Sequence, residues 1–366
     1  MPRLVHEADL EDLARGAAVL GTGGGGNPYI GKLLAQQAIR EHGPVTLLDA
    51  AELPDDALVV QSAMMGAPTV MVEKLPRGEE VVSAFQALQA RMNRKITHVT
   101  CGEAGGINST IPFVVAARLQ LPLVDADGMG RAFPELQMLI PGMYGIASTP
   151  MAIGDDKGNA VILDTVDNRW TERLARTATI EMGCSALIAC YAMSGAQVRE
   201  TMVLGTLSLC QELGGLIREA RKGHQDVVSK VVDRLSGRRI FRGRVVDLQR
   251  RTETGFARGS AVLAGLDDYL DQTLELQFQN EHLVAMSGDR VLASVPDLII
   301  VLDSETAEPV TTEELRYGFR VTVVAAPCDA RWRSPDGLLL VGPRYFGYDF
   351  DYVPFEEQLP LEAGSR

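Results

Sequence analysis

The chain has 366 residues, a formal net charge of −13, and a composition that is 46% hydrophobic and 23% charged. This length and composition predict about two domains, each with its own core, and exclude a disordered or fibrous protein. The negative charge argues against a nucleic acid or an anionic membrane as the main partner.

The first half of the chain alternates helical and strand patterns. Residues 8–20 place apolar side chains on one helical face, and Asn27 and Pro28 suit the N-cap and first position of a second helix. Further strand and helix patterns alternate within 45–49, 57–64, 78–93, 96–101, 109–119 and 121–127. A hairpin within 146–166 follows them. This βαβ alternation predicts an α/β domain over residues 1–167 with a mainly parallel sheet.

The second half of the chain, residues 168–366, is expected to form a helical segment followed by a β-rich domain. Helical patterns at 168–180 and 197–234 flank an apolar stretch at 185–193. Strand patterns then recur within 241–248, 259–265, 273–280, 281–288, 297–303, 320–326 and 337–342. Their spacing favours a sandwich or a barrel-like layer. One basic stretch, RRIFRGRVVDLQRR, runs against the acidic balance and is interpreted as the solvated face of a strand.

The glycine-rich segment GTGGGGNPYIG begins at Gly21 and resembles two nucleotide-binding motifs. The dinucleotide fingerprint G-x-G-x-x-G requires a preceding strand, whereas a helix is predicted here. The P-loop pattern fails at Leu33, where the magnesium-binding hydroxyl should stand, and Pro28 removes a backbone N–H from the loop. We therefore expect neither NAD nor ATP as a cofactor.

A ligand-binding role for this loop is still favoured. Exposed N–H groups before a helix N-terminus attract anions or polarised carbonyl oxygens, and glycines let a ligand approach the backbone. A mobile turn between two helices is the simpler alternative. Four consecutive glycines are conformationally costly for a turn alone, which favours the ligand loop.

Polar side chains gather after two of the predicted strands. Cys101 and Glu103 follow the first, and Asp125 and Asp127 end the second. Ligands bind outside the carboxyl ends of parallel strands, and crowded carboxylates raise one another's pKa, as acid–base catalysis requires. These four are the candidate catalytic residues. The alternatives are turn and capping chemistry for the two aspartates and a buried thiol for Cys101.

The same carboxylates could instead bind a divalent metal. The candidate ligands are Asp125, Asp127, Glu103 and His98, with Cys101 as a further donor. His98 falls inside a predicted strand, where a core histidine is the commoner outcome, and no HxH or HxxxH spacing occurs. The sequence leaves the metal undetermined.

Three blocks carry a resemblance to a known family: GTGGGGNP from residue 21, CGEAGGIN from residue 101 and DADGMGRAFPELQM from residue 125. The chain resembles the S-methyl thiohydantoin desulfurase family, formerly a domain of unknown function associated with hydantoinase/oxoprolinase-type proteins. The resemblance covers nearly the whole chain. It implies an N-terminal α/β domain, a β-rich C-terminal domain, and hydrolysis that replaces a C–S bond of a hydantoin-like five-membered ring by C–O.

The candidate residues suit that chemistry. Asp125, Asp127 and Glu103 would serve as acid or base, and Asn108 and the glycine loop would polarise the ring carbonyl. Arg131 would hold a substrate carboxylate. The expected substrate-binding set is Gly23, Gly24, Gly25, Gly26, Asn27, Asn108, Arg131 and Glu135.

The sequence favours an enzyme, a hydrolase or desulfurase acting on a small hydantoin- or thiohydantoin-like substrate. The alternative is a non-catalytic partner or ligand-binding subunit of a hydantoinase/oxoprolinase-type enzyme. Homo-oligomerisation is a general expectation. His282 falls in a polar stretch and is expected to be exposed, and two aromatic-rich segments at 328–337 and 342–355 either cover a site or form an interface.

Three features of the sequence bear on the cellular compartment of the protein. It has no apolar run long enough to span a bilayer, and its acidic N-terminus has no signal-peptide core. Five cysteines, an odd number without CxxC spacing, are typical of a reducing compartment. We therefore expect a cytoplasmic protein.

Overall fold

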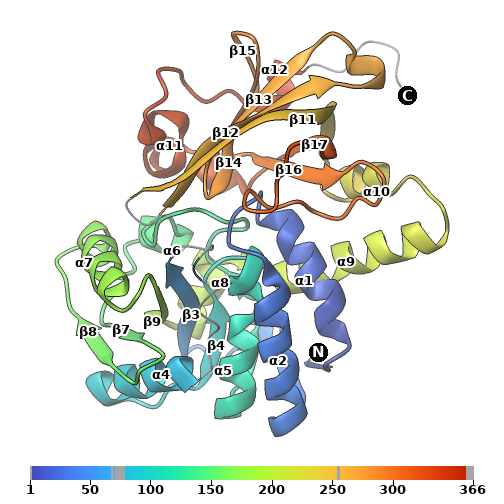
Figure 1. Ribbon diagram of the computed structural model, residues 1–366. Coiled ribbons are helices and arrows are strands. Elements are labelled where there is room, and N and C mark those ends of the chain that lie inside the picture. The colour runs from blue at the N-terminus through green and yellow to red at the C-terminus, as the bar shows by residue number, and fades with distance from the viewer. Residues whose placement is uncertain (1, 67–69, 71–78, 254–255, 360–366) are drawn as a thin grey trace.

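The computed structural model describes residues 2–66, 70, 79–253 and 256–359. It places a mixed α/β layer below a curved antiparallel sheet (Figure 1). In the described part of the chain, the strands of the first sheet run in the order β1 (Arg3–Val5), β2 (Val45–Leu48), β5 (Leu123–Val124), β4 (His98–Cys101), β3 (Leu58–Gly66), β9 (Ser185–Ser194), β7 (Met151–Gly154) and β8 (Ala160–Leu163).

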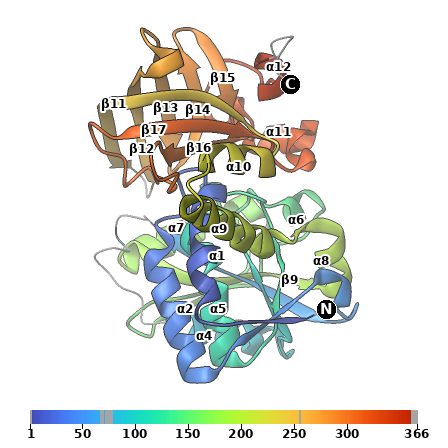
Figure 2. The same ribbon diagram turned by 90° about the vertical axis from the view of Figure 1, so that its right-hand side faces the viewer.

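Helices lie around this first sheet and between it and the second sheet (Figure 2). They are α1 (Asp9–Leu20), α2 (Pro28–His42), α4 (Glu79–Met92), α5 (Ile111–Leu119), α6 (Ile140–Met143), α7 (Asn168–Glu181), α8 (Gly195–Thr201), α9 (Thr206–Lys222) and α10 (Val227–Arg234), with the 3-10 turns η1 (Ala50–Glu52) and η2 (Gly106–Ser109). Asn27 caps α2 as the sequence predicts, because its side chain accepts a hydrogen bond from the Tyr29 N–H and Pro28 follows it.

The first sheet is mixed, which corrects the expectation of a mainly parallel one. β2, β5, β4 and β3 run parallel to one another in the βαβ units that the sequence predicts, while β1 pairs antiparallel with β2 at the edge of the sheet. The hairpin β7–β8 and strand β9 then add antiparallel pairs, with β9 antiparallel to β3. The added strands follow from the chain path. β9 is reached from the hairpin through α7 rather than through a parallel crossover.

The second sheet is antiparallel and forms a half-barrel. In the described residues its strands run in the order β15 (Arg290–Ser294), β14 (Glu281–Ser287), β13 (Thr273–Gln279), β12 (Phe256–Gly265), β11 (Arg238–Glu253), β17 (Arg320–Ala326) and β16 (Leu298–Asp303). Smaller elements beside this sheet are η3 (Asp267–Tyr269), η4 (Ala330–Arg333), α11 (Pro335–Val341), η5 (Pro343–Phe346) and α12 (Phe355–Gln358).

Two predicted strands take other forms. Residues 337–342 lie in and just after α11, because Ser334 caps that helix at the Gly337 N–H and Pro335 occupies its first position. The strand expected at 121–127 breaks at Asp125. Its end becomes β6 (Ala126–Asp127), which pairs with β10 (Val203–Leu204) outside the main sheet. This break decides where the two aspartates lie.

The first layer continues beyond residue 167, where the sequence suggested a division. β9 is an inner strand of the first sheet, whereas the second sheet begins at Arg238. Figure 2 shows α9 and α10 lying between the two layers. None of the described helices is both long and apolar enough to cross a membrane.

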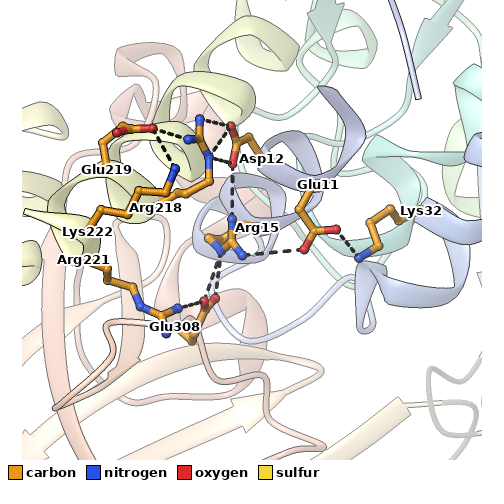
Figure 3. Close-up of polar contacts among 9 residues, drawn as sticks. All are labelled: Glu11, Asp12, Arg15, Lys32, Arg218, Glu219, Arg221, Lys222 and Glu308. Atoms are coloured by element: carbon orange, nitrogen blue, oxygen red, sulfur yellow. Dashed lines mark hydrogen bonds and ion pairs between the residues drawn. The ribbon is translucent and has the colours of Figure 1, made fainter. Parts of the chain in front are cut away.

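Ion pairs connect α1, α9 and the loop after β16 (Figure 3). Glu308 accepts from Arg15, with Nε and Oε2 3.1 Å apart, and also pairs with Arg221 of α9. Asp12 holds Arg218 at 2.8 Å. Each of these half-exposed pairs is worth less than about 1 kcal/mol, so their contribution is to orient the layers rather than to drive folding.

Candidate active site

A pocket lies between the layers, at the carboxyl ends of β3 and β4. Its volume is about 90 Å³. Its polar lining comes from both layers, with Glu103, Asn108 and Glu135 from the first, and Asn280 and Glu281 from the second. The other walls are mainly apolar, built by residues such as Met64, Met65, Met129, Phe133, Leu139 and Ile188. A small, largely apolar pocket with a few converging polar groups is typical of a ligand site.

Asn108 fixes the polar wall of the first layer. Its Oδ1 accepts from the Met64 N–H at 2.6 Å, and its Nδ2 donates to the Met64 carbonyl at 3.3 Å and to Glu103 Oε1 at 2.6 Å. The amide thereby continues the hydrogen bonding of β3 and anchors the glutamate that follows β4. Local sequence makes this possible, since Gly106 turns the chain with φ = 53° just before Asn108.

Glu103 is buried and has an unsatisfied oxygen. Oε1 is held by Asn108, while Oε2 has no hydrogen-bond partner among the described residues. Burial raises the pKa of Glu103 to about 7, and the hydrogen bond from Asn108 opposes that rise. A carboxyl group that titrates near neutrality can act as a base or as an acid at physiological pH.

Glu281 enters the same pocket from β14. Its Oε1 accepts from the Gly25 N–H at 3.2 Å, and its Oε2 lacks a partner in the described structure. Burial, and then the nearby charge of Glu103, raise the pKa of Glu281 well above its usual range, which favours its protonated form. The site therefore combines two buried carboxyl groups whose pKa values are both raised by burial.

The sequence analysis missed Glu281. It opens the otherwise apolar strand EHLVAM, and an acidic residue within a buried strand was the available signal. The neighbouring His282 corrects a second expectation. It is fully buried rather than exposed, because strand pairing carries it beneath the glycine loop, and burial lowers its pKa to about 3.

The glycine loop joins the two layers. Backbone carbonyls of Thr22 and Gly23 accept from the His282 and Thr312 N–H groups, both at 2.8 Å. A Cβ atom on Gly24 would overlap the Glu281 carboxylate, so glycine is required by that close approach. Of the binding residues predicted in this loop, Gly25 lines the pocket.

The remaining loop residues, Gly23, Gly24, Gly26 and Asn27, do not line the pocket. Asn27 caps α2 and also pairs with Glu314. Asn108 and Glu135 do line it. Glu135 Oε2 accepts from the Tyr345 hydroxyl at 2.6 Å, so the 342–355 segment packs against a pocket residue.

Asp125 and Asp127 lie outside the pocket, in the turn and cap roles that were the alternative. Asp125 Oδ1 accepts from the Leu207 and Ser208 N–H groups at 2.9 and 3.1 Å, at the start of α9. Asp127 Oδ2 accepts from Ala104, Met129 and Gly130 N–H groups at 2.8–3.0 Å. Asp127 thus holds the loop that carries Glu103.

Arg131 is fully buried and its guanidinium is engaged by the protein. Nη1 donates to the carbonyls of Pro296 and Asp297 at 2.8 and 2.7 Å, and Nη2 donates to Thr22 Oγ1 at 2.8 Å. These bonds tie the two layers together and leave Arg131 unable to reach a substrate carboxylate as the sequence suggested. Its charge stabilises the ionised forms of Glu281 and Glu103 instead.

Cys101 is also buried, and its Sγ donates to the carbonyls of Glu103 and Asn108 at 2.8 and 3.1 Å. Burial raises the pKa of this thiol well above its usual range, so it remains protonated. It therefore braces the backbone of the site, the role given as the alternative to a nucleophile.

The residues proposed as metal ligands are dispersed. His98 lies at the start of β4, the strand whose other end leads to Glu103, and its Nδ1 is 2.8 Å from Thr97 Oγ1. Across the described ranges, no three or more His, Cys, Asp or Glu side chains are grouped so as to hold a metal ion.

The raised pKa of Glu103 predicts a pH-dependent stability. The carboxyl group titrates near 4.5 when unfolded and at about 7 when folded. Its stabilising contribution is complete below 4.5 and is lost as the pH rises through 7. As the pH rises from 5 to 8, the free energy of unfolding of Glu103→Gln should therefore increase by about 3 kcal/mol relative to that of the unchanged protein. Urea unfolding of both proteins at several pH values measures this, and a constant difference would contradict it.

Comparisons with known proteins address the whole chain. The family model described as S-Me-THD-like, N-terminal domain, matches residues 8–165, and the one described as S-Me-THD-like, C-terminal domain, matches residues 166–355. A crystal structure of a Chromobacterium violaceum protein is similar, with 26% identity and a TM-score of 0.78, covering 96% of this chain and 100% of that chain. No curated protein matches.

Proposed function

Because the chain belongs to the S-Me-THD-like family, we propose that it is a hydrolase acting on a small five-membered ring of the hydantoin or thiohydantoin type. The reaction replaces the C–S bond of an S-methyl thiohydantoin by a C–O bond. One observation carries the proposal. Glu103 and Glu281, two buried carboxyl groups from different layers, line one small pocket, and each has an oxygen without a partner among the described residues.

The two carboxyl groups suit the two proton transfers that hydrolysis needs. Glu103, with a pKa of about 7, takes a proton from water as the water oxygen bonds to the ring carbon that carries sulfur. The C=N electron pair moves onto the ring nitrogen, which takes a proton from the protonated Glu281. This step gives a tetrahedral carbon that carries both the new hydroxyl group and the methylthio group.

Collapse of that carbon completes the reaction. The C–S bond breaks, and sulfur leaves with the electron pair and the proton held by Glu103. The hydroxyl group gives its proton to Glu281 as the C=O bond forms. One water has been consumed, methanethiol and a hydantoin have been released, and both carboxyl groups have returned to their starting states.

The remaining walls are assigned to binding. Asn108 is rigidly held, so the geometry of Glu103 beside the ring is fixed before substrate binds. Methionine side chains adapt to irregular shapes and are polarisable, which suits an alkylthio substituent. We assign the apolar wall with Met64, Met65 and Met129 to that substituent.

A release assay tests the function. The purified protein is incubated with an S-methyl thiohydantoin, a thiohydantoin and a hydantoin, and thiol or sulfide is followed over time. We expect methanethiol from the first compound, in proportion to enzyme concentration. Metal analysis of the same sample shows whether a divalent ion contributes.

Binding of the ring compounds without thiol release would point to the non-catalytic alternative. If the folded protein binds these rings but releases nothing, the hydrolase proposal is wrong. The chain would then be a ligand-binding subunit, the alternative class that its sequence left open.

A further inference from the structure

Arg176 is a charged residue of the pocket that takes no part in the proposed proton transfers. Among the described residues that line the pocket, Arg176 alone carries a positive charge, together with the carboxyl groups of Glu103, Glu135 and Glu281. It comes from α7, and 13% of its side-chain surface remains exposed. A charged side chain in a small, mainly apolar pocket is the kind of group that fixes the orientation and the identity of a ligand.

Both layers hold the guanidinium group of Arg176 in place. Its Nε donates to Glu172 Oε1, one turn earlier on α7, and Glu172 Oε2 accepts from the Leu136 N–H at 2.9 Å. Nη2 donates to the Pro134 carbonyl at 3.3 Å. From the second sheet, the centre of the Phe256 ring lies 4.2 Å from the guanidinium carbon. The group is therefore positioned before any ligand binds, which lowers the entropic cost of binding.

The third nitrogen of Arg176 is left for a ligand. Nη1 donates to none of the described residues. The ion pair with Glu172 does not prevent a second carboxylate from binding, because a guanidinium group has five N–H donors and Glu172 engages only the Nε side. Arg333 of this chain binds two carboxylates at once, with its Nη2 2.6 Å from Asp297 Oδ1 and 3.1 Å from Glu356 Oε1.

Asn280 supplies a neutral donor to the same pocket. Its Oδ1 accepts from the Ala257 N–H at 2.8 Å, which fixes the orientation of the amide and makes Nδ2 its other end. This Nδ2 donates to no residue in the described part of the chain, although Asn280 is only 7% exposed. Asn108 differs, because both ends of its amide are used within the protein. Since Asn280 directly precedes Glu281, it suits a ring carbonyl beside that carboxyl group.

The acidic residues of the pocket still permit an anion to bind. Glu135 Oε2 accepts hydrogen bonds from the Tyr345 hydroxyl at 2.6 Å and from the Gln137 amide, so the protein itself compensates this carboxylate. Burial raises the pKa of Glu103 to about 7 and that of Glu281 well above its usual range. The uncharged forms of these two groups are therefore more populated than in an exposed carboxyl group, which reduces their repulsion of a bound carboxylate.

We propose that Arg176 selects ring compounds that carry a carboxylate group, which its guanidinium group binds while Asn280 donates to a ring carbonyl. Planar guanidinium groups bind carboxylates through strong, charge-assisted hydrogen bonds. The inference names the substrate class of the proposed hydrolase, and it rests on the ring-binding part of that proposal but not on turnover. The role expected for Arg131 thus passes to Arg176, whose side chain lines the pocket.

Calorimetric titration of the full chain at neutral pH tests this selectivity. The probes are a carboxymethyl hydantoin and the matching carbamoylmethyl hydantoin, which differ in charge but little in size and are not turned over. We expect the acid to bind at least about tenfold more tightly than the amide, a difference typical of hydrogen bonds to charged groups. Arg176→Gln should bring the two affinities within about twofold of each other.

Arg173→Gln is the matched control. Arg173 is an exposed arginine of the same helix and also lies over an aromatic ring, that of Trp170, but it does not line the pocket. This variant loses the same charge and should keep the preference for the acid. Because Arg176→Gln leaves Glu172 without its ion-pair partner, the double variant Glu172→Gln with Arg176→Gln is titrated as well, and it should lose the preference equally.

The outcomes separate this inference from the proposed hydrolysis. Equal binding of acid and amide by the unchanged protein, or a preference for the acid that survives in the Arg176 variants, would overturn the selectivity and leave the thiol-release assay unaffected. Absence of binding by either ring compound would overturn both proposals. A preference for the acid that depends on Arg176, in a protein that releases no thiol, would support this inference and contradict the hydrolysis alone.

Discussion

Replacing Glu103 by Gln is expected to lower the rate of thiol release by about 10²- to 10⁴-fold, the usual contribution of a positioned general base. The amide keeps the size of the side chain and can still accept the hydrogen bond from Asn108 Nδ2, which now ends at Glu103 Oε1. The change therefore removes proton transfer with little change in shape. Steady-state kinetics on an S-methyl thiohydantoin measure the loss.

The pH profile identifies the group. Glu103 must be ionised to accept a proton, so kcat/KM should rise with pH through about 7 in the unchanged protein, and this rise should vanish in Glu103→Gln. Glu313→Gln is the matched control. Glu313 is another partly buried glutamate whose pKa burial raises, but it does not line the pocket. Activity of Glu103→Gln within threefold of the control would remove Glu103 from the mechanism.

Gly106→Ala is expected to cost about 3–5 kcal/mol of folding free energy, among the largest effects for one added methyl group. The residue adopts φ = 53°, which an alanine accepts only with strain. A Cβ atom there would also overlap the backbone of Gly25 and the Gly26 carbonyl. Backbone cannot rotate away as a side chain can, so the two glycine-rich segments must separate. Urea unfolding at constant pH measures the cost.

Gly158→Ala separates the cost of backbone strain at positive φ from the cost of the Cβ overlap. Gly158 also has a positive φ, 88°, but an added Cβ would meet no atom within 4 Å. We expect this control to cost only about 1 kcal/mol, the backbone strain alone. Gly106→Ala should additionally slow turnover at a temperature where it is still folded, because Gly25 and Asn108 lie beside the overlap. Equal costs in the two variants would show that the segments are not in tight contact.

Local rules account for most of the elements. The cap at Asn27, the βαβ units from β3 to β5 and the β7–β8 hairpin depend on neighbouring residues, and the structure confirms them. The mixed character of the first sheet does not follow from neighbouring residues. β9 is an apolar stretch whose sequence contains no information about which strand it joins or in which direction.

The candidate site divides in the same way. Glu103, Asn108 and Gly25 are brought together in the pocket, as the Gly-rich blocks suggested. Asp125 and Asp127 are not in the pocket. Their carboxylates instead accept hydrogen bonds from backbone N–H groups, those of Asp125 at the start of α9 and those of Asp127 in the loop that carries Glu103. Arg131 also lies outside the pocket lining, because a guanidinium group buried between the layers must donate its hydrogen bonds to carbonyls and a hydroxyl group of the protein.

The sequence by itself determined the family, the succession of helices and strands, and the loop that carries Glu103, because these follow from short-range patterns in one stretch of chain. Only the tertiary structure decided that Glu281, 178 positions away in the chain (281 − 103), shares the pocket with Glu103. Burial and pKa depend on what surrounds a group in space. For Glu103 most of that surrounding comes from segments that are distant in sequence.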